Sequence, residues 1–154
     1  MSTPHLSDQD VRTDLSTRQT RLKWVIVVDE GLPAGRVVNA AACMAAAVGK
    51  ALPDLLGRAG EDADGVRHPG LPWTGCSVLA ADAATVRAVR AKAAGYDELL
   101  IVDMPEPAQT ARVYDAYLAE LAGTAAGDLA YCAVSLVGPR NRINRLVGGL
   151  GLLR

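Results

Sequence analysis

Short apolar runs alternate with stretches of helical periodicity from Leu22 onward. The runs predict strands over residues 23–29, 76–81, 98–103 and 129–137. The first run, KWVIVVD, is continuously apolar between its charged ends, which is typical of a strand covered on both faces. Strand and helix signals in alternation favour a three-layer α/β domain.

Helices are expected between and after these strands, over residues 35–52, 83–94, 106–123 and 139–149. The first helix is apolar almost all round, which predicts that it is buried. Asp82 directly precedes the second helix and is expected to cap it. In the third helix Val113, Tyr117 and Leu121 recur at helical spacing, which predicts an amphipathic helix.

Two segments lack such a pattern. Residues 1–21 are polar, contain no hydrophobic core of a secretory signal, and are expected to form a flexible tail before a single domain over 22–154. Residues 53–75 form a long connection, interpreted first as a solvated, turn-rich loop. Within this loop His68 is a candidate lid residue over a neighbouring site, since loops often carry function.

Composition narrows the classes of function. The chain of 154 residues has a net charge of −1, a pI near 6.1 and 4% aromatic residues, which disfavours a dedicated nucleic-acid binder. No apolar run reaches the roughly 18 residues of a membrane span, so no membrane partner is expected. Cys43, Cys76 and Cys132 form no CxxC pair and are expected to be small, buried, reduced residues of a cytoplasmic protein.

Several kinds of chemistry are disfavoured by the motifs. The sequence DADG from Asp62 resembles the opening of a calcium loop, but Trp73 stands where the closing Glu is needed. No cluster of His or Cys has metal-ligand spacing, and no GxSxG elbow is present. With His5 in the tail and His68 in the loop, no Ser-His-Asp set is convincing. Neither a metal nor a cofactor is therefore expected.

The turn between the first strand and the first helix is the best candidate site. Its sequence, DEGLPAGRVVN, fits neither the G-x-G-x-x-G fingerprint nor the Walker loop. It still joins the end of a strand to the exposed amides of a helix, a favoured place for an anion or polar ligand. Asp29, Arg36 and Asn39 lie there, and Asn39 either contacts a ligand or bonds nearby backbone. Asp103 would join the same sheet edge if the first three strands are parallel, as a base, an orienting group or a helix cap.

Three blocks carry a resemblance to a known family: KWVIVVDEGLPAG with NAAA, DADG with HPG, and GPRNRINRLVGGLGLLR at the end. The chain resembles the bacterial domain-of-unknown-function family DUF2000, which is similar in fold to type II peptidyl-tRNA hydrolase. The resemblance implies an α/β/α sandwich around a four-stranded mixed sheet, a homodimer, and a last strand antiparallel to the others. Arg140, Asn141 and Asn144 then lie where Lys23 begins the first strand. A parallel last strand would bring them to Asp29 instead.

The resemblance also implies roles for single residues. Arg36 keeps one of the cations that serve the tRNA phosphate and the labile ester in the hydrolase, whereas Ala34 replaces a lysine. Asp103 matches the aspartate that closes the third strand, and Thr110 is a candidate for the hydroxyl residue that follows it. Since a lysine is lost, a small aminoacyl or peptidyl compound suits the site better than a whole tRNA.

Three functional hypotheses follow, and the sequence leaves open whether the chain is an enzyme. The first is hydrolysis or transfer at an acyl ester or amide, with Asp103 as base or orienting group, Arg36 facing an oxyanion and Asn39 fixing the substrate. Further substrate-binding candidates are Asp29, Thr110 and His68. The second is a non-catalytic module that binds a small molecule or anion. The third is a dimeric interaction protein with Tyr114 and Tyr117 at its interface.

Overall fold

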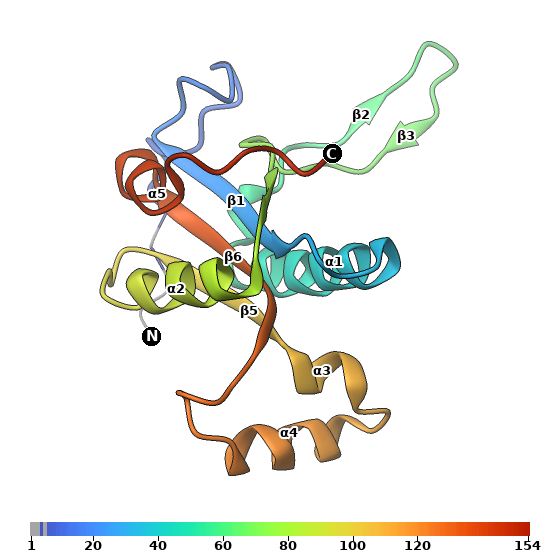
Figure 1. Ribbon diagram of the computed structural model, residues 1–154. Helices are drawn as coiled ribbons and strands as arrows, with labels where there is room; N and C mark the ends of the chain where they lie inside the picture. The colour runs from blue at the N-terminus through green and yellow to red at the C-terminus, as the bar shows by residue number, and fades with distance from the viewer. Residues whose placement is uncertain (1–3, 5) are drawn as a thin grey trace.

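The computed structural model describes residue 4 and residues 6–154, and it shows an α/β protein with a four-stranded mixed sheet (Figure 1). Across the sheet the strands are β4 (Ser77–Ala81), β1 (Leu22–Asp29), β6 (Tyr131–Pro139) and β5 (Leu100–Pro105). The helices are α1 (Ala34–Ala51), α2 (Ala83–Ala93), α3 (Glu106–Thr110), α4 (Tyr114–Gly123) and α5 (Arg140–Val147). Residues 1–3 and His5, which belong to the predicted tail, lie outside the described residues.

The direction of β6 decides which residues meet at each end of the sheet. β1 pairs with β4 in parallel, whereas β6 is antiparallel to both β1 and β5. The expectation of an antiparallel last strand is therefore confirmed. Leu22 pairs with Pro139 and Lys23 with Gly138, so the start of β1 lies beside the start of α5.

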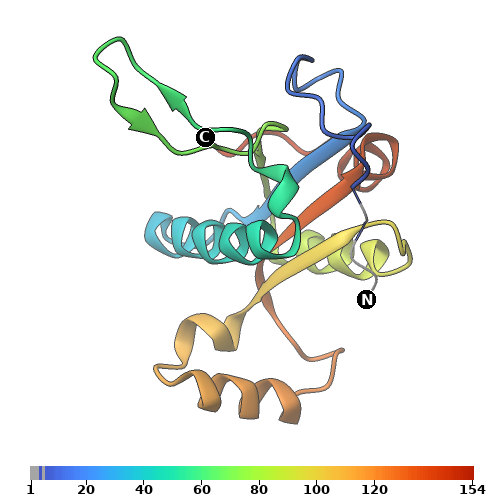
Figure 2. The same ribbon diagram turned by 180° about the vertical axis from the view of Figure 1, so that it is seen from behind.

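Helices cover both faces of the sheet (Figure 2). α1 packs on one face against Trp24, Ile26 and Val28, while α2 and α5 pack on the other against Val25 and Val27. This division follows from the alternation of side chains along β1, which is apolar on both sides. The sheet therefore carries two separate hydrophobic cores.

α1 is buried along one face only, so the prediction that it is buried all round is wrong. Its buried residues are Val37, Ala40, Met44 and Val48, whereas Val38 is 68% exposed. The helix is an outer layer of the sandwich, and its many alanines leave only small apolar surfaces in water. No helix in the described residues, α1 included, is long and apolar enough to cross a membrane.

The predicted helix over 106–123 is also wrong, because the chain breaks it into α3 and α4. Ala111 and Val113 have extended backbone, with ψ of 136° and 128°, and they end one helix and precede the other. α4 has no buried residue, and Val113 is 61% exposed. The apolar residues that keep helical spacing across the break therefore lie at the protein surface and not in a core.

The connection over 53–75 has more regular structure than a loop. A short 3-10 helix, η1 (Pro53–Leu55), precedes a two-stranded hairpin of β2 (Gly60–Glu61) and β3 (Arg67–His68). The hairpin projects from the body as an arm on the side away from α3 and α4 (Figure 1). The carboxylate of Asp62 shapes the hairpin turn by accepting bonds from the amides of Asp64 and Val66 at 3.0 and 2.9 Å. Because such turn residues dominate the segment, its sequence indicates a loop and not the two short strands.

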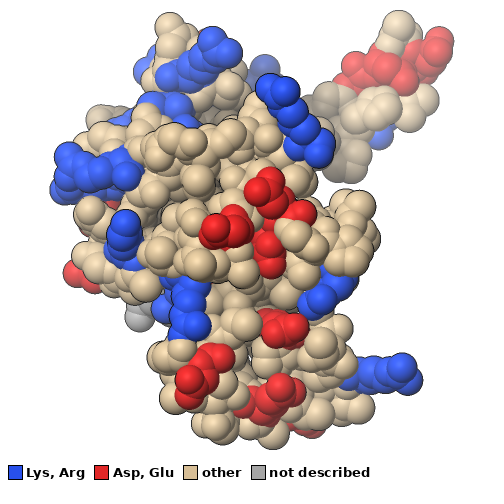
Figure 3. All heavy atoms as spheres, viewed as in Figure 1, with Lys and Arg blue, Asp and Glu red and all other residues tan. Residues whose placement is uncertain are grey.

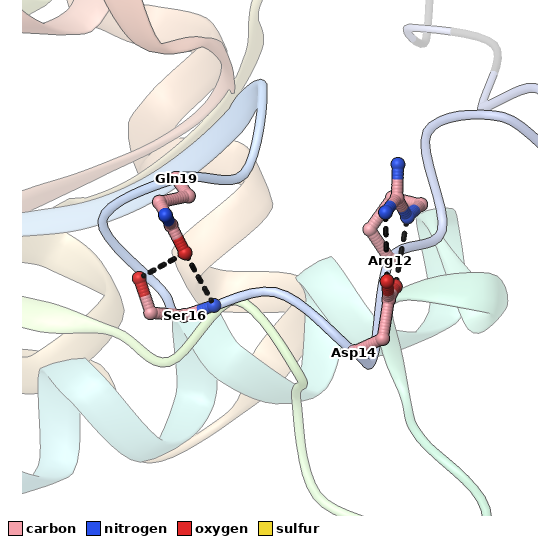
Figure 4. Close-up of polar contacts among 4 residues, drawn as sticks. All are labelled: Arg12, Asp14, Ser16 and Gln19. Carbon is pink, nitrogen blue, oxygen red and sulfur yellow. Dashed lines mark hydrogen bonds and ion pairs between the residues drawn. The ribbon is translucent and has the colours of Figure 1, made fainter.

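The segment before β1, predicted to be a flexible tail, contacts the body in its described part. Local bonds shape it: Arg12 donates twice to Asp14, and the Ser16 amide and hydroxyl donate to the side-chain oxygen of Gln19 (Figure 4). Arg140 holds the end of the segment by donating to the carbonyl oxygens of Thr17, Thr20 and Leu22. At the C-terminus, Ala80 donates to Gly151 and Leu153 donates to Val78, which covers the edge of β4.

The cysteines differ from the prediction that all three are buried. Cys132, in β6, is 4% exposed, whereas Cys43 and Cys76 are exposed. Cys43 is not among the buried residues of α1, and Cys76 directly precedes β4.

Candidate functional site

The turn between β1 and α1 is closed by Asp29. The carboxylate of Asp29 accepts a bond from the amide of Gly31 at 2.9 Å, and the carbonyl of Asp29 accepts one from Leu32 at 3.2 Å. α1 begins after Pro33 with no side-chain cap. The geometry therefore gives Asp29 a turn-forming role that requires no ligand.

Arg36 and Asn39 meet in a network built around a residue from another helix. Arg36 Nε donates to Gln109 Oε1 at 2.9 Å, and Gln109 Nε2 donates back to the Arg36 carbonyl at 2.8 Å and to Asn39 Oδ1 at 3.1 Å. Arg36 Nη2 also lies 3.6 Å from the sulfur of Cys132. Gln109 thus holds α3 against the first turns of α1. It also forms hydrogen bonds with the side chains of Arg36 and Asn39, which were predicted to face a substrate.

Two carboxylates lie near this network. Burial raises the pKa of the Cys132 thiol, and the charges of Glu106 and Asp29 act in the same direction, while Arg36 lowers it. These groups are therefore close enough to act on one thiol. Acidic side chains also gather around the end of β1 on the molecular surface (Figure 3). The electrostatic surroundings of Arg36 differ from those of a phosphate-binding surface, which concentrates positive charge.

Asp103 lies within β5, not at its end, because the strand continues to Pro105. Its carboxylate accepts a bond from Arg90 Nε of α2 at 3.0 Å, and both side chains are mostly buried. Asp103 does not cap the helix that follows, since α3 starts after Pro105 without a side-chain cap. The interpretation as a helix cap is therefore wrong. Asp103 is also not bonded to Arg36 or Asn39.

Thr110 and His68 lie apart from Asp103. The Thr110 hydroxyl bonds the carbonyl of Glu106 at 3.3 Å, within its own helix. His68 is exposed on the hairpin arm, with Nε2 3.3 Å from the carboxylate of Asp62. The arm points away from α3 and α4 (Figure 1), so His68 does not cover the site described next.

A cavity of about 470 Å³ opens between α1, the edge strand β5, and the pair α3 and α4. We call it the α1–α4 cavity. It is lined by Cys43, Met44, Ala47, Val102, Asp103, Met104, Pro105, Ala108, Ala111, Arg112, Val113, Tyr114 and Tyr117. Its walls are mainly apolar, with a few polar groups from Asp103, Arg112 and the tyrosines. This composition is typical of small-molecule sites.

The far wall of the cavity is formed by two tyrosines. The rings of Tyr114 and Tyr117 pack edge to face, with centroids 5.5 Å apart and planes at 71°. Burial raises the pKa of Tyr117, and the charge of Asp103 raises it further, so the phenol and the carboxylate share one environment. The Gln109 network adjoins the other end, since Gln109 follows Ala108 and Asn39 lies one helical turn before Cys43.

The structure thus places Asp103 at this cavity and Arg36 and Asn39 beside it. Sequence reasoning missed Gln109, Arg90 and Arg112, and considered Tyr114 and Tyr117 only as interface residues. The arginines and lysine of residues 83–94 predict a solvent-facing side of that helix, which would include Arg90, and nothing in the local pattern indicates a role for Gln109. In the described part of the chain, no three His, Cys, Asp or Glu side chains come together as metal ligands.

Similarity to other proteins, in fold and in sequence, identifies the family of this chain. This α/β fold with a mixed sheet is shared with a solved protein of unknown function from Agrobacterium tumefaciens strain C58, at a TM-score of 0.81 and 14% identity. The alignment covers 88% of this chain and 100% of that one, and at this identity it shows the fold alone. A family model described as "Protein of unknown function (DUF2000)" matches residues 22–154, and the chain belongs to that family. No functionally curated protein matches the chain significantly.

Proposed function

We propose that the chain binds a small molecule in the α1–α4 cavity. The observation that carries the proposal is the cavity itself: about 470 Å³ of mainly apolar space whose lining includes Asp103, a residue whose carboxylate is held by Arg90 of α2. Apolar walls supply affinity, and a few fixed polar groups supply orientation. The polar network of Arg36, Gln109 and Asn39 supports the rim, because it holds α3 against α1.

The chemistry of the wall favours a ligand with an amino group and an apolar body. Arg90 bonds one oxygen of Asp103, and the other oxygen has no hydrogen bond within the described residues. That oxygen accepts a proton donor, and an ammonium group suits a carboxylate best. Met44, Val102 and Met104 then contact the apolar part of the ligand. A small aminoacyl or peptidyl compound has both features.

Hydrolysis or transfer at an acyl ester or amide of such a compound is the second candidate function. It is favoured by the position of Asp103, the proposed base or orienting group, in the wall of the cavity. It agrees with the proposed likeness to type II peptidyl-tRNA hydrolase. A whole tRNA is the less favoured substrate, since acidic side chains surround the end of β1 near Arg36 (Figure 3).

Binding and catalysis are separated by two probes. Leucinamide carries an ammonium group and an isobutyl side chain, and calorimetry should show it binding in the millimolar range. Asp103→Asn should weaken that binding about tenfold, because the carboxylate charge is lost. Release of nitroaniline from leucine 4-nitroanilide by the wild type, abolished in Asp103→Asn, would select the enzyme. Binding without release would select the non-catalytic module.

A pair of variants on α1 gives the matched control. Ala47 lines the cavity and Ala46 does not, and both are exposed. Ala47→Trp should fill the cavity and abolish leucinamide binding, whereas Ala46→Trp should leave it unchanged. Equal binding by the two variants would contradict the proposed site.

Self-association through α4 is the remaining proposal. α4 has no buried residue, and Tyr114 and Leu118 are 72% and 44% exposed. A homodimer that covered these side chains would remove apolar surface from water. Sedimentation of the chain as a monomer at micromolar concentration would contradict this proposal.

A further inference from the structure

A second cavity, of about 620 Å³, lies at the opposite end of the sheet from the proposed site. It opens between the end of the N-terminal segment and the start of α5, where the antiparallel β6 brings them together. Its lining residues are Gln19, Thr20, Arg21, Glu98, Pro139, Arg140, Asn141, Arg142 and Asn144. We call it the basic cavity, since three of these residues are arginines.

Two of the arginines are neutralised by carboxylates. Arg21 pairs with Asp10 at 2.5 Å, and Arg142 pairs with Glu98 at 2.8 Å. Both arginines retain N–H groups outside those bonds, because a guanidinium has five donors. These pairs alone would make the cavity polar but nearly neutral.

Arg140, which lines the cavity, and Lys23, which adjoins it through Asn144, have no such partner. Among the described residues, no carboxylate lies within ion-pair distance of Arg140 or Lys23. Arg140 uses Nε and Nη2 on backbone carbonyl oxygens and the Thr20 hydroxyl, and Lys23 Nζ donates to Asn144 Oδ1 at 2.7 Å. These acceptors are neutral, so about two positive charges remain without a counter-charge at this end of the sheet.

The arrangement is unfavourable for the isolated chain. Burial lowers the pKa of Lys23, and the charge of Arg140 lowers it further, which reports repulsion between the two cations. Arg140 and Arg142 lie in the first turn of α5, where the helix has no acidic residue and its dipole disfavours cations. Basic side chains lie over α5 on the surface as well (Figure 3). A bound anion would relieve all of these interactions.

We propose that the basic cavity binds the phosphate group of a small, non-aromatic molecule, or inorganic phosphate itself. The uncompensated charges of Arg140 in the lining and of Lys23 beside it match a phosphate dianion, and guanidinium and ammonium donors are the groups that bind its oxygens. No aromatic residue is among those that line the cavity, so a nucleotide base would find no stacking partner. The site is separate from the α1–α4 cavity, and its occupancy does not depend on the function proposed there.

The test uses two phosphate probes and the full chain. Inorganic phosphate and glycerol 3-phosphate are titrated by calorimetry into the wild type, Lys23→Gln, Arg142→Gln and the control Lys50→Gln. Lys50 lies exposed near the end of α1, so its variant removes the same charge away from the cavity. We expect millimolar binding, weakened about tenfold by Lys23→Gln and by Arg142→Gln and unchanged by Lys50→Gln. Thermal unfolding establishes that each variant is folded.

The relative affinity of the two probes distinguishes a phosphate ester from free phosphate as the ligand. Tighter binding of glycerol 3-phosphate than of inorganic phosphate would assign the ester as the ligand, and the reverse would assign the free ion. Both results support a phosphate site if they depend on Lys23. Unchanged binding by Lys23→Gln, or no binding of either probe at about 10 mM, would overturn the proposal. Tighter binding of a single-stranded oligonucleotide than of both probes would overturn the assignment to a small molecule.

Discussion

Ser135→Ala tests the pairing of β1 with β6 at its most buried polar contact. The indole N–H of Trp24 donates to the hydroxyl of Ser135 at 2.8 Å, across the two central strands. Trp24 is 5% exposed and Ser135 is fully buried. Replacing Ser135 by alanine leaves the indole N–H in the core without its acceptor.

The magnitude follows from that loss. A buried donor left unsatisfied costs about 1–3 kcal/mol of the free energy of unfolding. For a domain of this size, 1 kcal/mol corresponds to roughly 2–4 °C in Tm. Trp24→Phe removes the donor itself, so in the double variant Ser135→Ala adds less than it does alone, by about 1 kcal/mol.

The assay is urea unfolding followed by far-UV circular dichroism, which does not depend on the tryptophan. Ser77→Ala is the matched control, since Ser77 on β4 is half-buried and its side chain makes no hydrogen bond within the described residues. Additive effects of Ser135→Ala and Trp24→Phe would refute the contact, and with it the register that aligns the ends of the sheet.

Three further predictions concern the layers around the sheet. Val48→Ala, on the buried face of α1, should cost about 1–3 kcal/mol in urea unfolding, whereas Val38→Ala, 68% exposed on the same helix, should be nearly neutral; equal costs would contradict the one-sided packing. Burial raises the pKa of Asp10, but bonds from Ser7 and the charge of Arg21 outweigh it, and the pKa lies below 3.8 overall. This stabilisation is present above the unfolded pKa and is lost as pH falls through the folded one, so the urea midpoint should drop below about pH 4, and less steeply in Asp10→Asn. In hydrogen exchange, the amides of α4 should exchange faster than those of α1, since α4 has no buried residue, and equal protection would show that α4 is covered in solution.

The strands were predictable because both faces of β1 and β6 are apolar. The predicted strand over 98–103 begins two residues before β5, because the apolar pattern includes Leu99 in the strand. Leu99 is buried, but it packs beneath Gly138, where a Cβ would lie 2.5 Å from its side chain. Apolar patterning reports burial, and a buried turn residue looks the same as a strand residue.

The helices show where periodicity stops being informative. Val113, Tyr117 and Leu121 keep helical spacing, yet the chain breaks before Tyr114 and the first two line a cavity instead of a core. The alanines of α1 are equally apolar on its buried and exposed faces. A hydrophobic pattern cannot distinguish these environments, because an open cavity and a core select the same residue types.

The candidate site was predictable in part. Asp103 was named from the end of an apolar run and does reach a cavity, while its partner Arg90 comes from a helix whose arginines mark a solvent face. Gln109 lies 73 residues from Arg36 and carries no local signal. Lys23 and Arg140 were placed together by the expected direction of β6, because that inference needed topology alone.

We propose that the α1–α4 cavity holds a ligand, and an NMR titration of the labelled chain with leucinamide shows where that ligand binds. We expect amide shifts that are concentrated at Ala47, Val102 and Tyr117 and lost in Ala47→Trp. Shifts centred on the turn at Gly31, or no shift at about 10 mM leucinamide, would contradict it.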